Sequence, residues 1–336
     1  MSANNRVFDT NVQLVKYRVL KEVIRRAYED NLQDAYLEIP KAICPGPKPE
    51  IRCCIYKERA ILQDRIKMAM GGDRNNPNPV EVIDIACDEC PAEGVMVTAA
   101  CRGCMVHACQ DVCPKGAISI VNHRAVVDKD KCVECGKCAK ACPYSALIMQ
   151  HRPCMISCKV KAISIDEDKK AKIDNEKCIS CGACVYKCPF GAITDKSYVL
   201  DIIDMLRQSE NNSKYRVYAV IAPAIVSQCR FGRPTQVVTA IHKLGFHQVV
   251  EAALGADITL YNEALEWKEK GLMTTSCCPS YVAFIEKNFP ELVPLISHSV
   301  SPMIMTAQLI KHSDPTAKVV FIGPCASKKF EFKLEK

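Results

Sequence analysis

The chain has 336 residues, 23 of them cysteines, and its 45 lysines and arginines exceed its 38 aspartates and glutamates, for a formal charge of +7. Hydrophobic residues make up 49% and charged residues 25%, a composition that excludes wholesale disorder. The length predicts about two domains of roughly 150 residues each. The number of cysteines is odd, and the chain is far too long to be a small disulfide-stabilised scaffold.

The cysteines indicate a protein of a reducing compartment rather than a secreted one. The first thirteen residues are polar and lack the apolar core of a signal peptide. The longest strongly apolar run, residues 217–226, is too short to span a bilayer and contains Pro223. We therefore expect a cytoplasmic protein without membrane contact, whose thiols bind metal.

The excess of positive charge suggests a nucleic-acid partner as an alternative. The basic residues are scattered, however, and they accompany no helix-turn-helix signature. The motifs GxxxxGK[ST] and strand-linked GxGxxG, which bind nucleotide phosphates, do not occur in the sequence. The sequence therefore predicts neither a nucleic-acid partner nor a bound nucleotide.

Cysteine density divides the chain into three predicted domains with an α+β fold overall. Residues 1–86 hold three cysteines and are expected to be helical. Residues 87–195 hold 16 cysteines and little else that could form a core. Residues 196–336 return to the alternation of strands and helices that is typical of an α/β domain with a mostly parallel sheet.

The N-terminal region is expected to contain two helices. Apolar residues at helical spacing predict the first over residues 12–37 and the second over 55–70, which ends at a Gly-Gly pair. The polar run 73–79 (DRNNPNP) is expected to be a linker. Three cysteines of this region are expected to be packing or surface thiols: Cys44, Cys53 and Cys54.

The C-terminal region is expected to alternate between strands and helices. Residues 216–221 and 318–322 have the composition of buried β-strands. Residues 234–244, 281–288 and 302–311 have helical patterns.

The middle region contains two intact copies of the spacing C-x2-C-x2-C-x3-C-P. They are Cys132, Cys135, Cys138 and Cys142, and Cys178, Cys181, Cys184 and Cys188. In this spacing three thiolates bind one [4Fe–4S] cluster and the fourth reaches a neighbouring cluster. Zinc also takes CxxC pairs, but it needs four ligands around one point and gives no reason for a third evenly spaced cysteine. The motifs therefore predict [4Fe–4S] clusters in a tandem bacterial-type 2[4Fe–4S] ferredoxin region.

The other cysteines of this region complete four ligand sets. Cys101, Cys104, Cys109 and Cys113 form a variant motif with a longer second gap, Cys154 and Cys158 form an ending without a leading CxxC, and Cys87 and Cys90 form a CxxC without an ending. The cross-over rule of two-cluster ferredoxins then predicts four clusters. Their ligands would be Cys101, Cys104, Cys109 and Cys142; Cys132, Cys135, Cys138 and Cys113; Cys178, Cys181, Cys184 and Cys158; and Cys87, Cys90, Cys154 and Cys188. In the alternative pairing, Cys87 and Cys90 trade places with Cys101 and Cys104.

Two nearby features have simpler explanations than metal binding. His107 lies inside the variant motif, but thiolates already fill all sixteen positions, so it is not expected to be a ligand. Residues 166–174 loosely resemble a calcium loop, yet they lack its glycine and closing glutamate. A charged hairpin turn is expected there.

Two cysteine motifs stand out in the C-terminal region. Residues 275–281 (TSCCPSY) open a helix after a turn, and residues 323–331 (GPCASKKFE) directly follow a predicted strand. Cysteines at strand ends of an α/β sheet lie where ligands bind in such folds. Any one of them could be a packing thiol, but a Cys-Cys-Pro turn together with a Pro-Cys-x-x-Lys turn favours a functional site.

These two motifs resemble the first two cysteine signatures of the [FeFe]-hydrogenases. Further similarity is present at 221–224 (IAPA), at 255–259 (GADIT) and at Ser301-Pro302. The resemblance covers roughly residues 87–331 and is greatest to the ferredoxin-rich branch of the family. The sequence departs from the signatures at Tyr281, where the family usually has Trp, and at Gly323, where it usually has Met, and Cys229 has no counterpart with a known role.

The resemblance implies an enzyme that reversibly reduces protons to H2 at an H-cluster, a [4Fe–4S] cubane joined to a di-iron subcluster. It also implies a partial hydrogenase catalytic domain at 196–336, a ferredoxin or other low-potential electron carrier as partner, and maturation proteins that insert the cluster. By resemblance, Cys278 and Cys325 ligate the cubane, and Cys277 exchanges protons with the di-iron subcluster. The resemblance also implies a proton path through Glu263, Glu266 and Ser301. It further implies that Lys328 hydrogen-bonds a cyanide ligand and that Met305 lies near the cluster.

The family's third cysteine signature, with the last two cubane ligands, would lie beyond residue 331, and no cysteine follows Cys325. We therefore expect a fragment, a partner that supplies the missing ligands, or a loss of catalysis, and favour a truncated chain that is inactive alone. Two other functions stay open: a polyferredoxin that only transfers electrons, and an iron–sulfur assembly or sensor protein of the Nar type.

Overall fold

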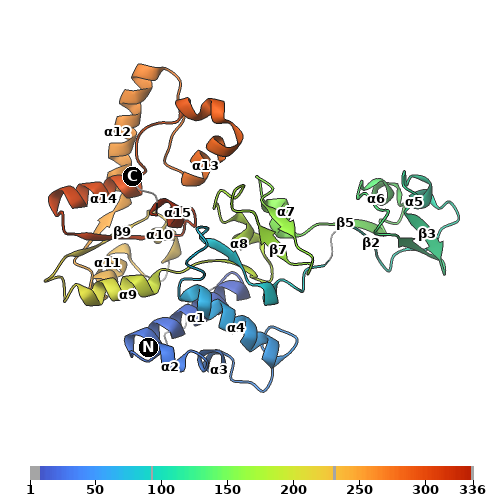
Figure 1. The fold of residues 1–336 in the computed structure, drawn as a ribbon, viewed down its shortest axis with the longest axis horizontal. Helices are drawn as coiled ribbons and strands as arrows, with labels where there is room; N and C mark the ends of the chain where they lie inside the picture. The colour runs from blue at the N-terminus through green and yellow to red at the C-terminus, as the bar shows by residue number, and fades with distance from the viewer. Residues whose placement is uncertain (1–7, 92–93, 230–231, 334–336) are drawn as a thin grey trace.

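The computed structural model describes residues 8–91, 94–229 and 232–333 and arranges them in four units (Figure 1). A helical N-terminal unit, two small cysteine-rich units and an α/β unit follow one another, and this mixture confirms the α+β fold class. We call the cysteine-rich segments 80–90 and 153–195 the inner unit, and residues 94–150 the outer unit. Within the described ranges, the helices are all too short or too polar to cross a membrane.

The N-terminal unit is built on two long helices that share one hydrophobic core. Its elements are α1 (Asn11–Tyr28), α2 (Leu32–Ala35), α3 (Ile39–Ile43) and α4 (Ile55–Ala69). Thr10 caps α1 by accepting a hydrogen bond from Gln13 N at 3.3 Å. The first predicted helix was too long: α1 ends at Tyr28 because Asp30 has φ +55°, which a continuing helix does not allow. The second predicted helix is confirmed as α4.

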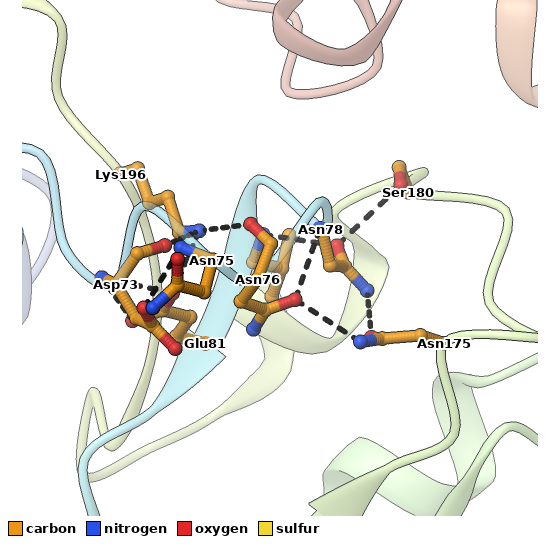
Figure 2. A network of polar contacts seen from close by, with 9 residues as sticks. Asp73, Asn75, Asn76, Asn78, Glu81, Asn175, Ser180 and Lys196 are labelled. Atoms are coloured by element: carbon orange, nitrogen blue, oxygen red, sulfur yellow. Dashed lines mark hydrogen bonds and ion pairs between the residues drawn. The ribbon is translucent and has the colours of Figure 1, made fainter.

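The segment 73–79, which was expected to be a linker, is a hydrogen-bonded loop around a buried lysine (Figure 2). Lys196 is 1% exposed, and its Nζ donates to Asp73 O and Asn76 O at 2.6 Å each and lies 2.7 Å from Glu81 Oε1. Asn78 continues the network, because its Nδ2 donates to Asn175 Oδ1 at 3.1 Å. The loop is therefore fixed by side chains 97 to 123 residues away in the sequence, a feature that its polar composition does not reveal.

The inner and outer units have the same plan of short helices and two-stranded sheets. The inner unit contains β1 (Val80–Val82), the 3-10 turn Asp84–Ala86, α7 (Pro153–Ser157), β6 (Ile163–Ile165), β7 (Ala171–Ile173), α8 (Ala183–Lys187) and β8 (Ile193–Asp195). The outer unit contains β2 (Gly94–Val97), α5 (Ala108–Asp111), β3 (Ile118–Val121), β4 (Arg124–Val127), α6 (Lys137–Ala141) and β5 (Leu147–Gln150). The antiparallel strand pairs are β1–β8 and β6–β7 in the inner unit, and β2–β5 and β3–β4 in the outer unit. The outer unit is thus inserted into the inner one, which lies between it and the α/β unit in Figure 1.

The α/β unit contains a three-stranded parallel sheet in the order β10-β9-β11. Its elements are α9 (Val199–Gln208), β9 (Val217–Ile221), α10 (Ile225–Gln228), α11 (Pro234–Lys243), β10 (Gln248–Glu251), α12 (Ala252–Lys270), α13 (Pro279–Asn288), the 3-10 helix Pro290–Leu295, α14 (Pro302–Ser313), β11 (Lys318–Ile322) and α15 (Lys328–Glu331). The register pairs Val220 of β9 with Val250 and Phe321, so the carboxyl ends of the strands meet at one edge. Both strands and all three helices predicted here are present, within two residues at each end.

The predicted domain boundaries at 86/87 and 195/196 are crossed by packing. Strand β1 pairs with β8 from the far end of the cysteine-rich region. Helix α9 contributes Ile203 to the core around α1, and Ile202 and Leu206 to the core beneath β9. The N-terminal helices therefore pack against segments of both the inner unit and the α/β unit.

Candidate functional site

The four cysteines that end the motifs share one local geometry. Each accepts a hydrogen bond from the N–H of the alanine four residues later, at 3.2–3.3 Å: Cys113 from Ala117, Cys142 from Ala146, Cys158 from Ala162 and Cys188 from Ala192. The turn after each cysteine aims a backbone dipole at the sulfur, which favours the thiolate form that iron binds. The predicted repeats are therefore structural repeats.

The structure gathers seven of the eight thiols of the outer unit in two groups. One cavity is lined by the first group, Cys113, Cys132, Cys135 and Cys138. In the second group, burial raises the pKa of Cys109, and the nearby Cys142 and Cys104 add to this rise. Each group thus combines thiols of both motifs, which is the cross-over that two-cluster ferredoxins use.

Eight thiols of the inner unit form two further groups. Cys158, Cys178, Cys181 and Cys184 line one cavity, and burial raises the pKa of Cys184 to about 12. Cys154 faces Cys188, Cys90 and Cys87, and burial with these neighbours raises its pKa to about 11. Both thiols are protonated at neutral pH without metal, so cluster binding must release their protons.

Cys87 and Cys101 occupy equivalent positions in the two units. Cys87 Sγ accepts a hydrogen bond from Ala171 N in β7, and Cys101 Sγ accepts one from Ala125 N in β4, both at 3.3 Å. Each alanine lies in the second strand of the hairpin within its own unit. Cys87 therefore holds the same place in the inner unit that Cys101 holds in the outer unit.

The thiol groups are not arranged around a single point. Across the described residues, no three histidine, cysteine, aspartate or glutamate side chains converge closely enough to hold one metal ion.

His107 is the N-cap residue of α5 and has φ +47°. Residues 166–170 form the turn of the β6–β7 hairpin, in which Asp166 N donates to Lys170 O at 2.9 Å, as expected for a charged hairpin turn.

The two C-terminal cysteine motifs lie against each other at the strand-end edge of the sheet. Cys278 precedes α13 as its N-cap residue, and Cys325 lies in the turn between β11 and α15. Two hydrogen bonds join the motifs: Lys328 Nζ donates to Cys277 O at 2.9 Å, and Ser280 Oγ to Ser327 Oγ at 2.7 Å. Glu331 holds Lys328 in place: its carboxylate is 1% exposed and accepts a hydrogen bond from Lys328 Nζ at 2.6 Å. The three thiols Cys277, Cys278 and Cys325 are exposed.

Two carboxylates of α12 lie next to serines that the sequence did not single out. Glu263 is buried, and its Oε1 accepts from Ser276 N at 3.4 Å, directly beside Cys277. Glu266 Oε2 accepts from Ser297 Oγ at 2.6 Å. Burial alone would raise the pKa of Glu266, but Lys270, Ser297 and His298 N–H together lower it to about 2. Glu266 is therefore a permanent carboxylate at neutral pH.

Ser301 and Met305 lie on the neighbouring helix α14. Ser301 is fully buried at the N-cap, where its Oγ accepts from Ile304 N at 3.5 Å. Met305 is half-buried one turn later. Gly255 of α12 allows α14 to approach, because a Cβ on it would lie 2.3 Å from Pro302 O. Thr259 Oγ1 of α12 also donates to Val300 O at 3.2 Å, so the start of α14 with Ser301 lies against the helix that carries Glu263 and Glu266.

The inner unit touches the α/β unit at its cysteine motifs. Lys287 Nζ of α13 donates to Cys178 O at 2.8 Å. The loop around Gly182 packs so closely on Ala326 that a Cβ on the glycine would lie 2.9 Å from the alanine Cβ. The thiol group with Cys178 and Cys181 is thereby held beside the turn that carries Cys325.

Comparisons with known proteins agree with this arrangement. Residues 215–336 match the family described as iron-only hydrogenase large subunit, C-terminal domain, residues 100–146 match the 4Fe-4S dicluster domain, and residues 171–194 match the 4Fe-4S binding domain. These segments correspond to the α/β unit, the outer unit and the second half of the inner unit.

Two curated hydrogenases are similar over most of the chain. Iron hydrogenase 1 of Clostridium pasteurianum is 32% identical over 243 residues, which are 65% of this chain and 41% of the relative. The periplasmic [Fe] hydrogenase large subunit of Nitratidesulfovibrio vulgaris is 31% identical over 233 residues, 62% of this chain and 51% of the relative. The cytosolic Fe-S cluster assembly factor NAR1 of Kluyveromyces lactis is 38% identical over 68 residues, 20% of this chain and 14% of the relative.

The chain spans about half or less of the length of these curated relatives. It nevertheless shares with the hydrogenases both its iron–sulfur domains and the domain with the two C-terminal cysteine motifs. The chain therefore combines a domain that matches the C-terminal domain of iron-only hydrogenase large subunits with several [4Fe–4S] domains of the electron-transfer type.

Proposed function

We propose that this chain carries electrons through four [4Fe–4S] clusters to a hydrogenase-type centre at Cys278 and Cys325, where protons are reduced reversibly to H2. The observation that carries the proposal is the junction at which Lys287 and Gly182 hold the Cys178 loop against the Cys325 turn. The inner unit lies between the outer unit and the α/β unit, so the proposed clusters would follow one another in that order (Figure 1).

The four thiol groups are the proposed ligand sets of the clusters. They are Cys101, Cys104, Cys109 and Cys142; Cys113, Cys132, Cys135 and Cys138; Cys158, Cys178, Cys181 and Cys184; and Cys87, Cys90, Cys154 and Cys188. The chemistry of the sites fits, because each combines four thiols with backbone N–H groups directed at sulfur.

Cys278 and Cys325 would hold one side of the cubane of an H-cluster. A cubane takes four thiolates, so two more would come from polypeptide other than the residues described. When bound, this cofactor would supply the metal centre at which protons and electrons combine. Lys328, fixed between Cys277 O and Glu331, would present its ammonium to an anionic iron ligand.

The proposed proton path starts at Cys277 and continues along α12. Ser276 N–H and Glu263 lie next to this thiol, and Glu266 with Ser297 lies one helical turn further. Ser301 and Met305 would line the same path from α14. Glu263 is the group best suited to relay a proton, since Glu266 is held ionised by its hydrogen bonds.

The proposed electron donor is a ferredoxin or another low-potential carrier, and maturation proteins would install the H-cluster. A cytoplasmic location stays a prediction, because one relative is named periplasmic.

Iron analysis and infrared spectroscopy after anaerobic reconstitution and maturation test the proposal. Four clusters correspond to about sixteen irons per chain, and fewer than about twelve would refute them. Infrared bands of iron-bound CO and CN⁻ would support an H-cluster when the polypeptide that supplies the two other cubane thiolates is present, and their absence under that condition would refute it. With only two cubane ligands, this chain is expected to evolve no H2 alone, and clear turnover with reduced viologen would contradict that expectation.

A second candidate is electron transfer or iron–sulfur assembly without H2 chemistry. The similarity to NAR1 favours it, since that relative is named as an assembly factor. Redox-active clusters without the CO and CN⁻ bands would support this candidate.

A further inference from the structure

A buried arginine lies against one thiol group of the inner unit. Arg152 is 2% exposed and precedes α7, two residues before Cys154. Its Nη1 donates to Cys87 Sγ at 3.8 Å, and its Nη2 donates to Lys169 O at 2.6 Å. A guanidinium keeps its charge at every pH that proteins tolerate. The structure therefore holds a full positive charge at the edge of this group.

The other three thiol groups have no arginine at the position that corresponds to Arg152. Two residues before the corresponding cysteine stand His107 in the variant motif and Gly136 and Gly182 in the intact motifs. Both glycines adopt positive φ as N-cap residues, whereas Arg152 has an extended backbone with φ −72° and ψ 132°. The split between Cys90 and Cys154 brings in a different chain segment here, and that segment supplies the arginine.

A second arginine strengthens the positive field around the same group. Arg65 of α4 is buried, and its Nη2 donates to Phe190 O at 3.2 Å, two residues after Cys188. Cys87, Cys154 and Cys188 are buried as well. Away from water, charges interact more strongly than they do at the surface.

We propose that Arg152 tunes the cluster bound by Cys87, Cys90, Cys154 and Cys188 by raising its reduction potential, an inference that rests on the ligand set proposed above. One electron from a low-potential carrier oxidises the carrier and adds one negative charge to the cluster, without a proton. A fixed positive charge stabilises the reduced cluster more than the oxidised one.

The position of this cluster gives the tuning a role. Among the cysteines of the inner unit, Cys90 and Cys154 are the nearest in sequence to the two strands that lead into the outer unit. The cluster would therefore receive electrons from the outer unit and pass them to the Cys178 group beside the α/β unit. A higher reduction potential than that of its neighbours would make this cluster retain an electron that arrives from the outer unit.

Anaerobic redox titration of the reconstituted full chain, followed by electron paramagnetic resonance, tests the inference. We expect Arg152→Gln to shift one transition by about a tenfold change in the ratio of reduced to oxidised cluster, which is about 59 mV to lower potential for one electron. Arg152→Lys keeps the charge and should keep most of the potential. The matched control is Arg124→Gln, an exposed arginine whose charge faces Cys101 in the outer unit. Its effect should be less than half as large because water screens it.

The outcomes separate this inference from the proposed ligand sets. Full iron content with no shifted transition in Arg152→Gln overturns the inference, and so does an equal shift in Arg152→Lys, because packing rather than charge would then be responsible. Where Arg152→Gln does not fold, Arg65→Gln is expected to shift the same transition in the same direction by a smaller amount, and no shift overturns the inference. A wild-type chain that binds fewer than about twelve irons contradicts the ligand sets instead.

Discussion

Lys329 Nζ lies 2.5 Å from Asp195 Oδ2, and this ion pair joins the last helix of the α/β unit to the last strand of the inner unit. The other carboxylate oxygen of Asp195 binds Lys16 of α1. One carboxylate therefore connects three units whose relative positions decide how close the thiol groups lie. Burial alone would raise the pKa of Asp195, but the two lysines lower it to about 2.

Asp195→Asn should destabilise the protein by about 2.5 kcal/mol at neutral pH, which is the free energy that corresponds to the lowered pKa. Because the folded pKa lies below the unfolded one, this stabilisation is present above pH 5 and is lost as the pH falls toward 2. The measurement is denaturant unfolding of both proteins at several pH values. Asp204→Asn, at an exposed position of α9, is the control and should change little. A difference that does not shrink at low pH would contradict the explanation.

Lys196 is the second residue that holds the units together. Lys196→Met should cost about 3 to 5 kcal/mol, because it leaves the Glu81 carboxylate and two backbone carbonyls without their buried cation. Unfolding in denaturant measures this loss. Lys67→Met is the matched control, since Lys67 pairs with Asp64 on the surface, and it should cost less than about 0.5 kcal/mol. Equal effects of the two substitutions would show that Lys196 is not an anchor.

Local patterns predicted two strands and three helices of the α/β unit, because that information lies within a few residues, but they missed β10 and the long helix α12. β-Branched runs identified β9 and β11, and the spacing of Cys132 to Cys142 is a complete motif in itself. The end of α1 was missed, because it depends on a left-handed Asp30 rather than on hydrophobic spacing. The cross-over between motifs was predictable only from the ferredoxin rule.

Features that depend on distant contacts were not predictable. The loop 73–79 is ordered by Lys196, and the sequence of the loop itself does not predict this contact. Ser276 and Ser297 join Glu263 and Glu266 only because the crossing of α12 and α14 and the return of the chain after α13 bring them there. Ser276 belongs to the motif at 275–281, but nothing in the motif shows that its N–H meets Glu263, and no sequence signal selects Ser297.

Gly255 controls the crossing of α12 and α14, which positions Glu263 and Ser301. Gly255→Ala should destabilise the protein by about 1 to 2 kcal/mol, although alanine favours helices by about 1 kcal/mol, because the new Cβ meets Pro302 O and Thr306 Oγ1 at 2.3 Å. Unfolding in denaturant measures the effect. The double variant with Thr306→Ala should be less destabilised than the sum of the two single variants, because one of the two clashes disappears. Additive effects would place the strain elsewhere.

The two halves of the split motif can be tested by counting iron. Cys87→Ala and Cys154→Ala should each remove about four irons, and the double variant should also remove only about four, because both thiols belong to one cluster. Cys101→Ala combined with Cys154→Ala should instead remove about eight, since these thiols belong to different clusters. The alternative pairing, in which Cys87 and Cys101 trade places, predicts the reverse for the two double variants. Cys54→Ala, at an exposed thiol on the cap of α4, should leave the iron content unchanged. Hydrogen bonds from Ala171 to Cys87 and from Ala125 to Cys101 favour the first result, because each cysteine is tied to the hairpin of its own unit.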